Sequence, residues 1–222
     1  MRPRRGEVQV RAGTEADPPA LTELYNHYVR ETPVTFDTEP FSPERRRPWL
    51  LSHPQDGPHR LLVARETTEG ANTSHIGAAT AEAAGPAETA ETAETPGTAG
   101  TAGTAGIPGT AGTALLGYAT SSVLRPKAAC ATSVEVTVHC APRAVGRGIG
   151  IGIGIGTLLY QALFDALADE DVHRAYAGIT QPNEASVRLH ARFGFRHLGT
   201  YEEVGHKFGR YWDVAWYEKR LG

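Results

Sequence analysis

The sequence has little cysteine, no long apolar run and no excess of positive charge. Its two cysteines, Cys130 and Cys140, lie ten residues apart around one expected strand, so no turn brings them together for a disulfide. We expect two free thiols, in keeping with a cytoplasmic protein. A zinc site would need a second pair of ligands, which His139 beside Cys140 lacks elsewhere in the sequence. We therefore expect no metal.

The missing features also argue against several partners. A formal net charge of −3 over 222 residues, with no basic stripe, disfavours nucleic acid as the main partner. No apolar run approaches the length of a membrane span. Arg2, Arg4 and Arg5 are not followed by an apolar region, so we expect no signal peptide.

The patterning that is present predicts a single α/β domain over residues 1–222. Apolar residues from Leu21 to Tyr28 follow the spacing of one helix face, and Thr14 with Asp17 resembles a capping box before them. In chain order, the expected elements are a helix over Thr14–Arg30, strands over Arg60–Arg65, Ala114–Ser121 and Val134–Cys140, a helix over Thr157–Ala168, a strand over Arg174–Thr180, a helix from Asn183 to Phe193 and a strand over Tyr211–Lys219. This alternation indicates a mixed sheet flanked by helices.

A repetitive segment separates two strands that would ordinarily be joined by a short turn. Residues 67–113 intervene between them, and Glu88–Ala114 consists of nine triplets such as ETA and GTA. Because the segment lacks large apolar residues, it cannot bury enough surface to offset its chain entropy. We predict a long disordered insertion in a hairpin, which a fold tolerates because the cost of loop closure grows slowly with length.

A glycine-rich loop, Val145–Gly150, follows the expected central strand and leads into the next helix. Backbone N–H groups at a helix N-terminus bind phosphate or pyrophosphate. Ile-Gly occurs four times over residues 149–156, which is more than one such turn needs. Two arrangements stay open. Either Gly146–Gly150 form the anion site, or Gly152–Gly156 form it and the surplus residues lie between strand and site.

Four ordered stretches carry a resemblance to a known family and cover nearly all of the chain outside residues 67–113. They are Asn26-His27-Tyr28 with Thr35 to Pro40; Glu135 to Val138 with Pro142-Arg143; Gly146 to Gly150 with Asn183 to His190 and Gly194-Phe195; and Lys207, Gly209, Trp212 and Asp213. In this order they resemble the GNAT superfamily of N-acetyltransferases, and within it the phosphinothricin-type enzymes. The glycine loop alone would be a weak signal, and the ordered set is more specific.

The resemblance implies acetyl-CoA as co-substrate, bound where the central strand splays away from its neighbour. Backbone groups of that strand would pair with the pantetheine arm, and the glycine-loop amides would hold the pyrophosphate. Asn183 would contact the arm from the other side. The residues so implied are Val138, His139, Cys140, Gly146, Arg147, Gly148, Ile149, Gly150, Asn183 and Ser186.

The resemblance also implies two catalytic residues. Glu135 would act as general base toward the substrate amine through a water molecule, and His190 would protonate the leaving thiolate. From the residues alone, the alternation between Val134 and Val136 favours a solvated strand position for Glu135. A packing role on the helix is an equal alternative for His190.

The implied acceptor is a small amino acid such as phosphinothricin, methionine sulfone or methionine sulfoximine. The candidates for contacting it are Phe36, Arg125, Lys127 and Lys207. Cationic side chains suit carboxylate and phosphinate groups, although each cation taken singly is typical of a solvated surface. Cys130 replaces an aromatic residue of the family pattern and His139 replaces a tyrosine. These two differences concern the identity of the substrate more than the reaction. A homodimer is implied by analogy alone.

Two other interpretations remain in view. In one, the expanded loop has impaired coenzyme binding, and the domain is a non-enzymatic or partner-binding module. The other is a dinucleotide-binding oxidoreductase, but Gly146, Gly148 and Gly150 give G-x-G-x-G, without the spacing of a dinucleotide fingerprint.

The length of the repeated loop also predicts an effect on coenzyme affinity. Because a rigid set of backbone amides binds an anion better than a long, less rigid loop, we expect weaker acetyl-CoA binding than in a chain lacking Ile151–Gly156.

Overall fold

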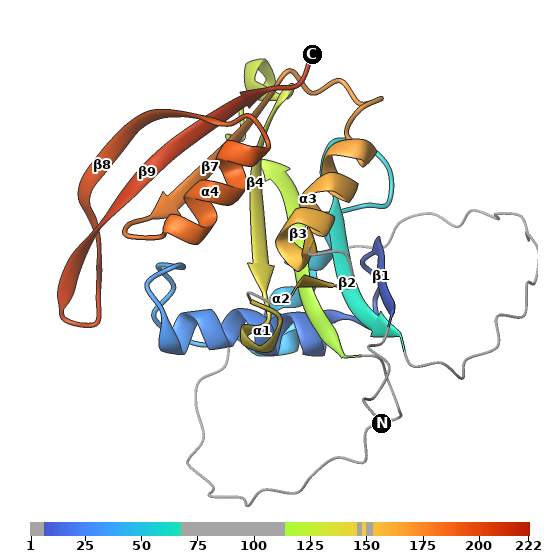
Figure 1. Cartoon of the computed structure of the whole chain (residues 1–222), viewed down its shortest axis with the longest axis horizontal. Coiled ribbons are helices and arrows are strands. Elements are labelled where there is room, and N and C mark those ends of the chain that lie inside the picture. The colour runs from blue at the N-terminus through green and yellow to red at the C-terminus, as the bar shows by residue number, and fades with distance from the viewer. Residues whose placement is uncertain (1–6, 68–113, 146–147, 150–152) are drawn as a thin grey trace, which may run out of the picture. The chain divides into compact units, whose positions relative to one another are not determined.

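The computed structural model describes residues 7–67, 114–145, 148–149 and 153–222. All of them fall within one compact unit, formed by Met1–Thr68 with Thr113–Gly222. A seven-stranded sheet runs through this unit in the order β1-β2-β3-β4-β7-β9-β8 (Figure 1). Its strands are β1 (Glu7–Ala12), β2 (Leu61–Thr67), β3 (Leu115–Val123), β4 (Ser133–Cys140), β7 (Arg174–Thr180), β8 (Arg196–Lys207) and β9 (Arg210–Arg220). Strands β4 and β7 pair in parallel and the other neighbours antiparallel, so the predicted mixed sheet is confirmed.

The helices among the described residues cover both faces of this sheet. They are α1 (Pro18–Glu31), α2 (Pro43–Leu51), α3 (Ile155–Ala166) and α4 (Glu184–Arg192). Neighbouring residues of a strand point to opposite faces. A Cβ atom on Gly117 of β3 would lie 3.2 Å from the Leu159 side chain of α3, whereas the next residue, Tyr118, packs its ring against Trp49 of α2. Helices α3 and α2 therefore lie on opposite faces.

The main core lies between the sheet and α3. Val134 and Val136 of β4 are almost fully buried, as are Leu159 and Leu163 of α3. The two leucines are four residues apart, which places them on one face of the helix. This is the apolar face that the sequence predicted. None of the helices among the described residues is long and apolar enough to cross a membrane.

The start of α1 differs from the prediction. The helix begins at Pro18 and not at Thr14, and its N-cap, Asp17, makes no side-chain capping bond. A proline favours the first helical position because its missing N–H has no intrahelical partner there. Thr14 is therefore not the N-cap, and of the two bonds of the predicted capping box only the one from the Thr14 N–H to the Asp17 carboxylate, at 2.8 Å, is present.

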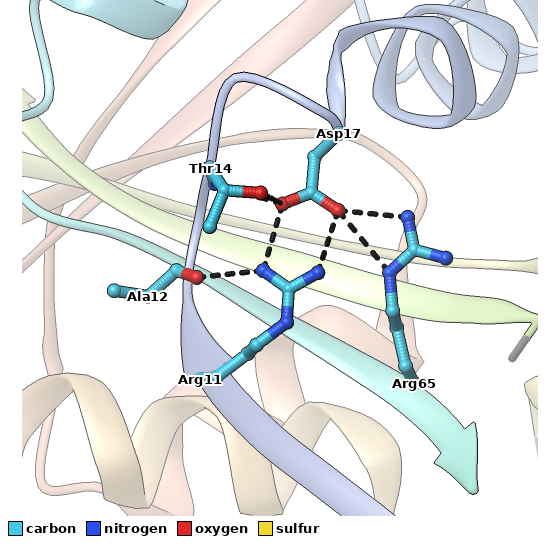
Figure 2. Close-up of polar contacts among 5 residues, drawn as sticks. All are labelled: Arg11, Ala12, Thr14, Asp17 and Arg65. Carbon is cyan, nitrogen blue, oxygen red and sulfur yellow. Dashed lines mark hydrogen bonds and ion pairs between the residues drawn. The ribbon is translucent and has the colours of Figure 1, made fainter. Parts of the chain in front are cut away.

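The Asp17 carboxylate instead forms a buried charge cluster with two arginines (Figure 2). It accepts hydrogen bonds from Arg11 of β1 at 2.8 and 2.9 Å and from Arg65 of β2 at 2.7 and 3.2 Å. The Thr14 hydroxyl donates to the same carboxylate at 2.9 Å. The cluster joins two strands to the start of α1.

Strands β2 and β3 pair as antiparallel neighbours, which confirms the predicted hairpin. The long insertion between them, including its expected disorder, lies outside the described residues. Strand β7 has the predicted bounds, and α4 is capped by Asn183, whose side-chain oxygen accepts from the Ser186 N–H at 3.1 Å. Gly194 follows α4 with a φ of +81°, as expected for a helix end.

The described part of the glycine-rich loop forms two short paired strands ahead of α3. Strand β5 (Gly148–Ile149) pairs antiparallel with β6 (Ile153–Gly154) in a small hairpin. Helix α3 begins after it, at Ile155. Gly148 and Ile149 therefore lie in the hairpin, and not at the helix N-terminus that their predicted role requires. Gly146, Arg147 and Gly150 lie outside the described residues.

Candidate active site

Strands β4 and β7 form the opening around which the site is built. They pair from Ser133 opposite Arg174 to Glu135 opposite Tyr176, and no register pairs follow. Beyond this point the two strands separate, as Figure 1 shows. A cavity of about 550 Å³ is lined from both faces, by Glu135 on one side and His190 on the other. The gap between β4 and β7 therefore lets one cavity extend from one face of the sheet to the other.

Glu135 lies at the last paired position before the opening. Its side chain is half-buried and lines the cavity, on the same face of β4 as His139, four residues along. Burial raises the pKa of its carboxyl. The residue opposite it on β3, Ser122, donates its hydroxyl hydrogen to the Nε2 atom of His53 at 2.9 Å. Glu135 is thus a desolvated acid at the junction of the two faces, and not a solvated strand residue.

His190 is buried on the α3 side of the opening and has partners at both ring nitrogens. Its Nδ1 atom lies 2.8 Å from the Ser186 carbonyl oxygen, and a carbonyl can only accept, so Nδ1 carries a proton. In the neutral ring, Nε2 then accepts from the Tyr160 hydroxyl at 2.8 Å. Burial lowers the pKa of the imidazole, which favours this neutral form at pH 7. Tyr160 and His190 both line the cavity.

The residues predicted to hold the coenzyme arm divide into two groups. Val138, Asn183 and Ser186 line the cavity around the opening. Cys140 is not among the lining residues, and its carbonyl oxygen accepts from the Tyr28 hydroxyl at 2.7 Å. His139 does line the cavity, but on the α1 and α2 side.

His139 is buried within an aromatic group. Its ring stacks on Tyr118 with 5.1 Å between centroids and meets the edge of Tyr28 at 4.7 Å. Its Nδ1 atom is buried and has no hydrogen-bond partner among the described residues. Burial, with a smaller contribution from the charge of Arg46, lowers its pKa to about 3. The ring is therefore neutral at physiological pH.

The four residues predicted to contact the acceptor are not brought together. Arg125 and Lys127 are exposed in the segment after β3 and do not line the cavity. Phe36 packs against the backbone of Gly205, where an added Cβ would lie 2.2 Å from its ring. Lys207 is buried and donates its ammonium to the Thr35 carbonyl at 2.8 Å. Phe36 and Lys207 thus attach the loop that follows α1 to the β8–β9 hairpin.

Sequence reasoning missed two arginines that line the cavity, the exposed Arg45 and the buried Arg46. Arg46 lies on α2, is 7% exposed and places its guanidinium carbon 3.9 Å from the Tyr25 ring centroid. Ser42 and Pro43 were signals for this helix, since Ser42 accepts from the Arg45 N–H as N-cap and Pro43 opens the first turn. The residues that follow have no apolar periodicity, which is why no helix was predicted.

Comparison with known proteins agrees with this geometry. Residues 114–216 match the family described as Acetyltransferase (GNAT) domain. The chain is 58% identical over 219 residues to a phosphinothricin N-acetyltransferase of Streptomyces coelicolor, covering 99% of each chain. It is 54% identical to an N-acetyltransferase of Streptomyces griseus, covering 100% of this chain and 91% of the relative.

The fold has solved counterparts. A GNAT superfamily phosphinothricin acetyltransferase from Sinorhizobium meliloti, in complex with AcCoA, superposes with a TM-score of 0.70. It is 21% identical, and the match covers 97% of this chain and 89% of the other. The divided sheet is thus the fold of that structure. The chain belongs to the GNAT acetyltransferases and is an acetyl-CoA-dependent N-acetyltransferase.

Proposed function

We propose that the acceptor is a small amino acid such as phosphinothricin, methionine sulfone or methionine sulfoximine, acetylated on its amine. The observation that carries the proposal is the cavity that joins a desolvated carboxylate, Glu135, to the opened edge of β4. The name of the relative at 58% identity supports the substrate class. A cavity of about 550 Å³ also suits a small acceptor beside one end of a coenzyme.

The described residues fit acetyl-CoA. Beyond Glu135, β4 is not paired with β7, and such an edge offers backbone groups to an amide-bearing chain. Helix α3 begins at Ile155 after a glycine N-cap, and bare N–H groups at a helix N-terminus suit a pyrophosphate. We therefore assign the pyrophosphate cradle to Gly154–Gly156. Acetyl-CoA supplies the acetyl group as a thioester.

Glu135 is our proposed general base. It accepts a proton from the substrate ammonium through a water molecule, which frees the amine nitrogen to bond to the acetyl carbon. The carbon–sulfur bond then breaks and the sulfur takes up a proton. The nitrogen loses two protons in total, so one balances the proton on sulfur and one leaves to solvent.

For the proton on sulfur, we propose that His190 acts as a pair with Tyr160. The neutral His190 ring has its proton on Nδ1, directed to Ser186, and its Nε2 atom accepts from the Tyr160 hydroxyl. To protonate the sulfur, this hydroxyl turns from Nε2 toward the sulfur, and its oxygen then regains a proton from solvent. If the pair acts together, Tyr160→Phe lowers kcat about as much as His190→Gln, on the order of 100-fold. A large loss for His190→Gln with an unchanged Tyr160→Phe would assign the proton to His190 alone.

The test of the substrate class is thiol release from acetyl-CoA in the presence of a panel of amino acids. We expect turnover with phosphinothricin or methionine sulfone, and little with amines that carry no carboxylate. Identification of an N-acetylated product by mass spectrometry completes the assignment. Turnover with simple alkylamines at equal efficiency would refute the amino-acid proposal, while leaving acetyl transfer itself in place.

We also propose a cytoplasmic homodimer formed through the β8–β9 hairpin. Both cysteines are free thiols, as in the reducing cytoplasm. The exposed large apolar side chains of the hairpin are Leu198, Tyr201, Val204, Phe208 and Tyr211. Gathered apolar side chains mark interaction surfaces. In analytical ultracentrifugation, Val204→Lys is expected to give a monomer and Val123→Lys, exposed elsewhere, a dimer; a monomeric wild type would refute the proposal.

A further inference from the structure

Arg46 is a buried cation without an anionic partner. It is 7% exposed and lines the cavity, with its guanidinium between the rings of Tyr25 at 3.9 Å and Trp49 at 4.2 Å. No carboxylate of the described residues lies within ion-pair distance of it. Asp37, which lines the same cavity, is bonded to the Tyr25 hydroxyl instead.

A buried guanidinium without a counter-ion destabilises the fold unless a bound ligand supplies the missing anion. Taking a charge out of water is unfavourable without a counter-ion. Aromatic faces attract the cation but do not neutralise it. The positive charge acts on its surroundings, because it contributes to the lowered pKa of His139 and of His53, although burial is the larger cause in both. The cavity therefore contains a cation, Arg46, with which no carboxylate of the described residues forms an ion pair.

A second group near Arg46 also lacks a partner. The Nδ1 atom of His139 is buried without a hydrogen bond among the described residues. Its ring stacks on Tyr118, which packs against Trp49, the residue under Arg46. Buried polar atoms in native proteins are nearly always satisfied, so an unpartnered one on a residue that lines a cavity is a second sign of a ligand.

We propose that Arg46, assisted by His139, binds the distal acidic group of the acceptor, and so selects amino acids whose side chain ends in an anion. This inference rests on the proposed function. A planar guanidinium held between two rings presents its N–H edge in the fork that matches a carboxylate or phosphinate. Arg46 thereby takes the role that the sequence suggested for Arg125, Lys127 and Lys207.

Spacing along β4 indicates whether Arg46 binds the α-carboxylate of the acceptor or the acidic group at the end of its side chain. Glu135 and His139 are four residues apart, and at about 3.3 Å per residue their Cα atoms lie roughly 13 Å apart. The α-carboxylate of an amino acid is too close to its amine to reach Arg46 and His139 while the amine lies near Glu135. A group at the far end of the side chain, with a water between amine and Glu135, spans this distance better.

The experiment compares matched pairs of acceptors that differ in the charge of the distal group. Phosphinothricin is paired with methionine sulfone, and glutamate with glutamine. For Arg46→Gln we expect kcat/KM for the acidic member of each pair to fall roughly 100-fold, and that for the neutral member to change less than about threefold. The KM for acetyl-CoA should stay the same.

Two further variants separate charge from fold. Arg46→Lys keeps the charge without the fork and is expected to recover part of the preference for the acidic member. Arg47→Gln removes an exposed arginine of the same helix, and should behave as wild type. Thermal unfolding of each variant checks that the fold is intact. An equal loss for both members of a pair, or no loss, overturns the inference.

The same series distinguishes failure of the inference from failure of the proposed function. A wild type that prefers the neutral member of each pair overturns the role of Arg46 while acetyl transfer to amino acids stands. A wild type that acetylates no amino acid overturns the proposed function. Calorimetric titration with glutarate then tests Arg46 directly, since binding lost in Arg46→Gln supports it and equal binding or none refutes it.

Discussion

Two regions of this molecule bury charge in opposite ways. At the start of α1, the Asp17 carboxylate is fully enclosed and accepts hydrogen bonds from Arg11, Arg65 and Thr14. In the cavity, burial raises the pKa of the Glu135 carboxyl, and Arg46 has no ion-pair partner among the described residues. The first region satisfies its charges internally and supports the fold. The second leaves them available, as a binding site requires.

The largest effect is expected at the paired region. Asp17→Asn would leave Arg11 and Arg65 without their shared carboxylate, so we expect a loss of about 3–5 kcal/mol in the free energy of unfolding. The folded fraction should keep the wild-type KM values, since the cluster does not line the cavity. Denaturant unfolding together with steady-state kinetics measures both. A stable variant with altered KM would contradict the division between the regions.

The same cluster predicts how stability depends on pH. Burial by itself would raise the pKa of Asp17, but the hydrogen bonds from Arg11, Thr14 and Arg65 outweigh it and hold the pKa well below its usual range. A depressed pKa gives stability that is fully present above the unfolded value, about 4, and is lost as the pH falls below it. The stability difference between wild type and Asp17→Asn should shrink on acidification below about pH 4. A constant difference would contradict this origin.

Glu135→Gln tests the unpaired carboxylate of the cavity. We expect kcat to fall about 100- to 1000-fold with an unchanged affinity for acetyl-CoA. Because burial raises the pKa of Glu135, wild-type kcat/KM should rise with pH through a limb above the ordinary range of a glutamate. This limb should be absent in the variant. Stopped assays across pH check it, and wild-type turnover by Glu135→Gln would remove the assignment.

Arg46→Leu tests whether the unpaired cation of the cavity contributes to stability, as the paired Asp17 does. Replacing a buried unpaired cation with an apolar residue is often neutral or stabilising, so we expect the free energy of unfolding to change by less than about 1 kcal/mol or to rise. Activity toward acidic acceptors should be lost in the same protein. Thermal and denaturant unfolding measure the first effect. A loss as large as that of Asp17→Asn would show that Arg46 is a structural residue.

The smallest effect concerns the repeated loop. The β5–β6 hairpin lengthens the connection between β4 and α3, and a longer connection holds the helix N-terminus less firmly. Deleting Ile151–Gly156 gives the same sequence as deleting Ile149–Gly154, so one Ile-Gly step remains before Thr157 to form the cradle. We expect acetyl-CoA to bind a few-fold more tightly to the shortened chain, as measured by calorimetry. Equal affinity would show that the hairpin does not weaken the cradle.

The two regions also differ in how far the sequence predicted them. Strand β7 and the Asn183-capped helix follow from local patterns, alternation and a capping residue, and both are confirmed. Glu135 and His190 follow from a family resemblance, and the structure brings both to one cavity. Both residues lie in contiguous segments around β4 and α4 that the motifs cover, whereas Cys140 of the same motif does not line the cavity.

The acceptor side could not be predicted in the same way, because distant segments build it. Arg46 lies in a helix of three consecutive arginines and an internal proline, which has no apolar face to reveal it. Its place against Tyr25 depends on tertiary packing alone. Arg125 and Lys127 had the right charge, but the chain turns them outward to solvent. The sequence indicated that a cationic side chain would contact the acceptor, but it did not indicate which cationic side chain is buried in the cavity.

A competition assay tests the central claim most directly. Wild-type protein is given acetyl-CoA with equal concentrations of phosphinothricin and methionine sulfone, and the two N-acetylated products are counted by mass spectrometry. Their initial ratio equals the ratio of the kcat/KM values. The buried cation Arg46 predicts an excess of N-acetylphosphinothricin that Arg46→Gln abolishes. Equal products in the wild type, or an excess that survives in the variant, would contradict it.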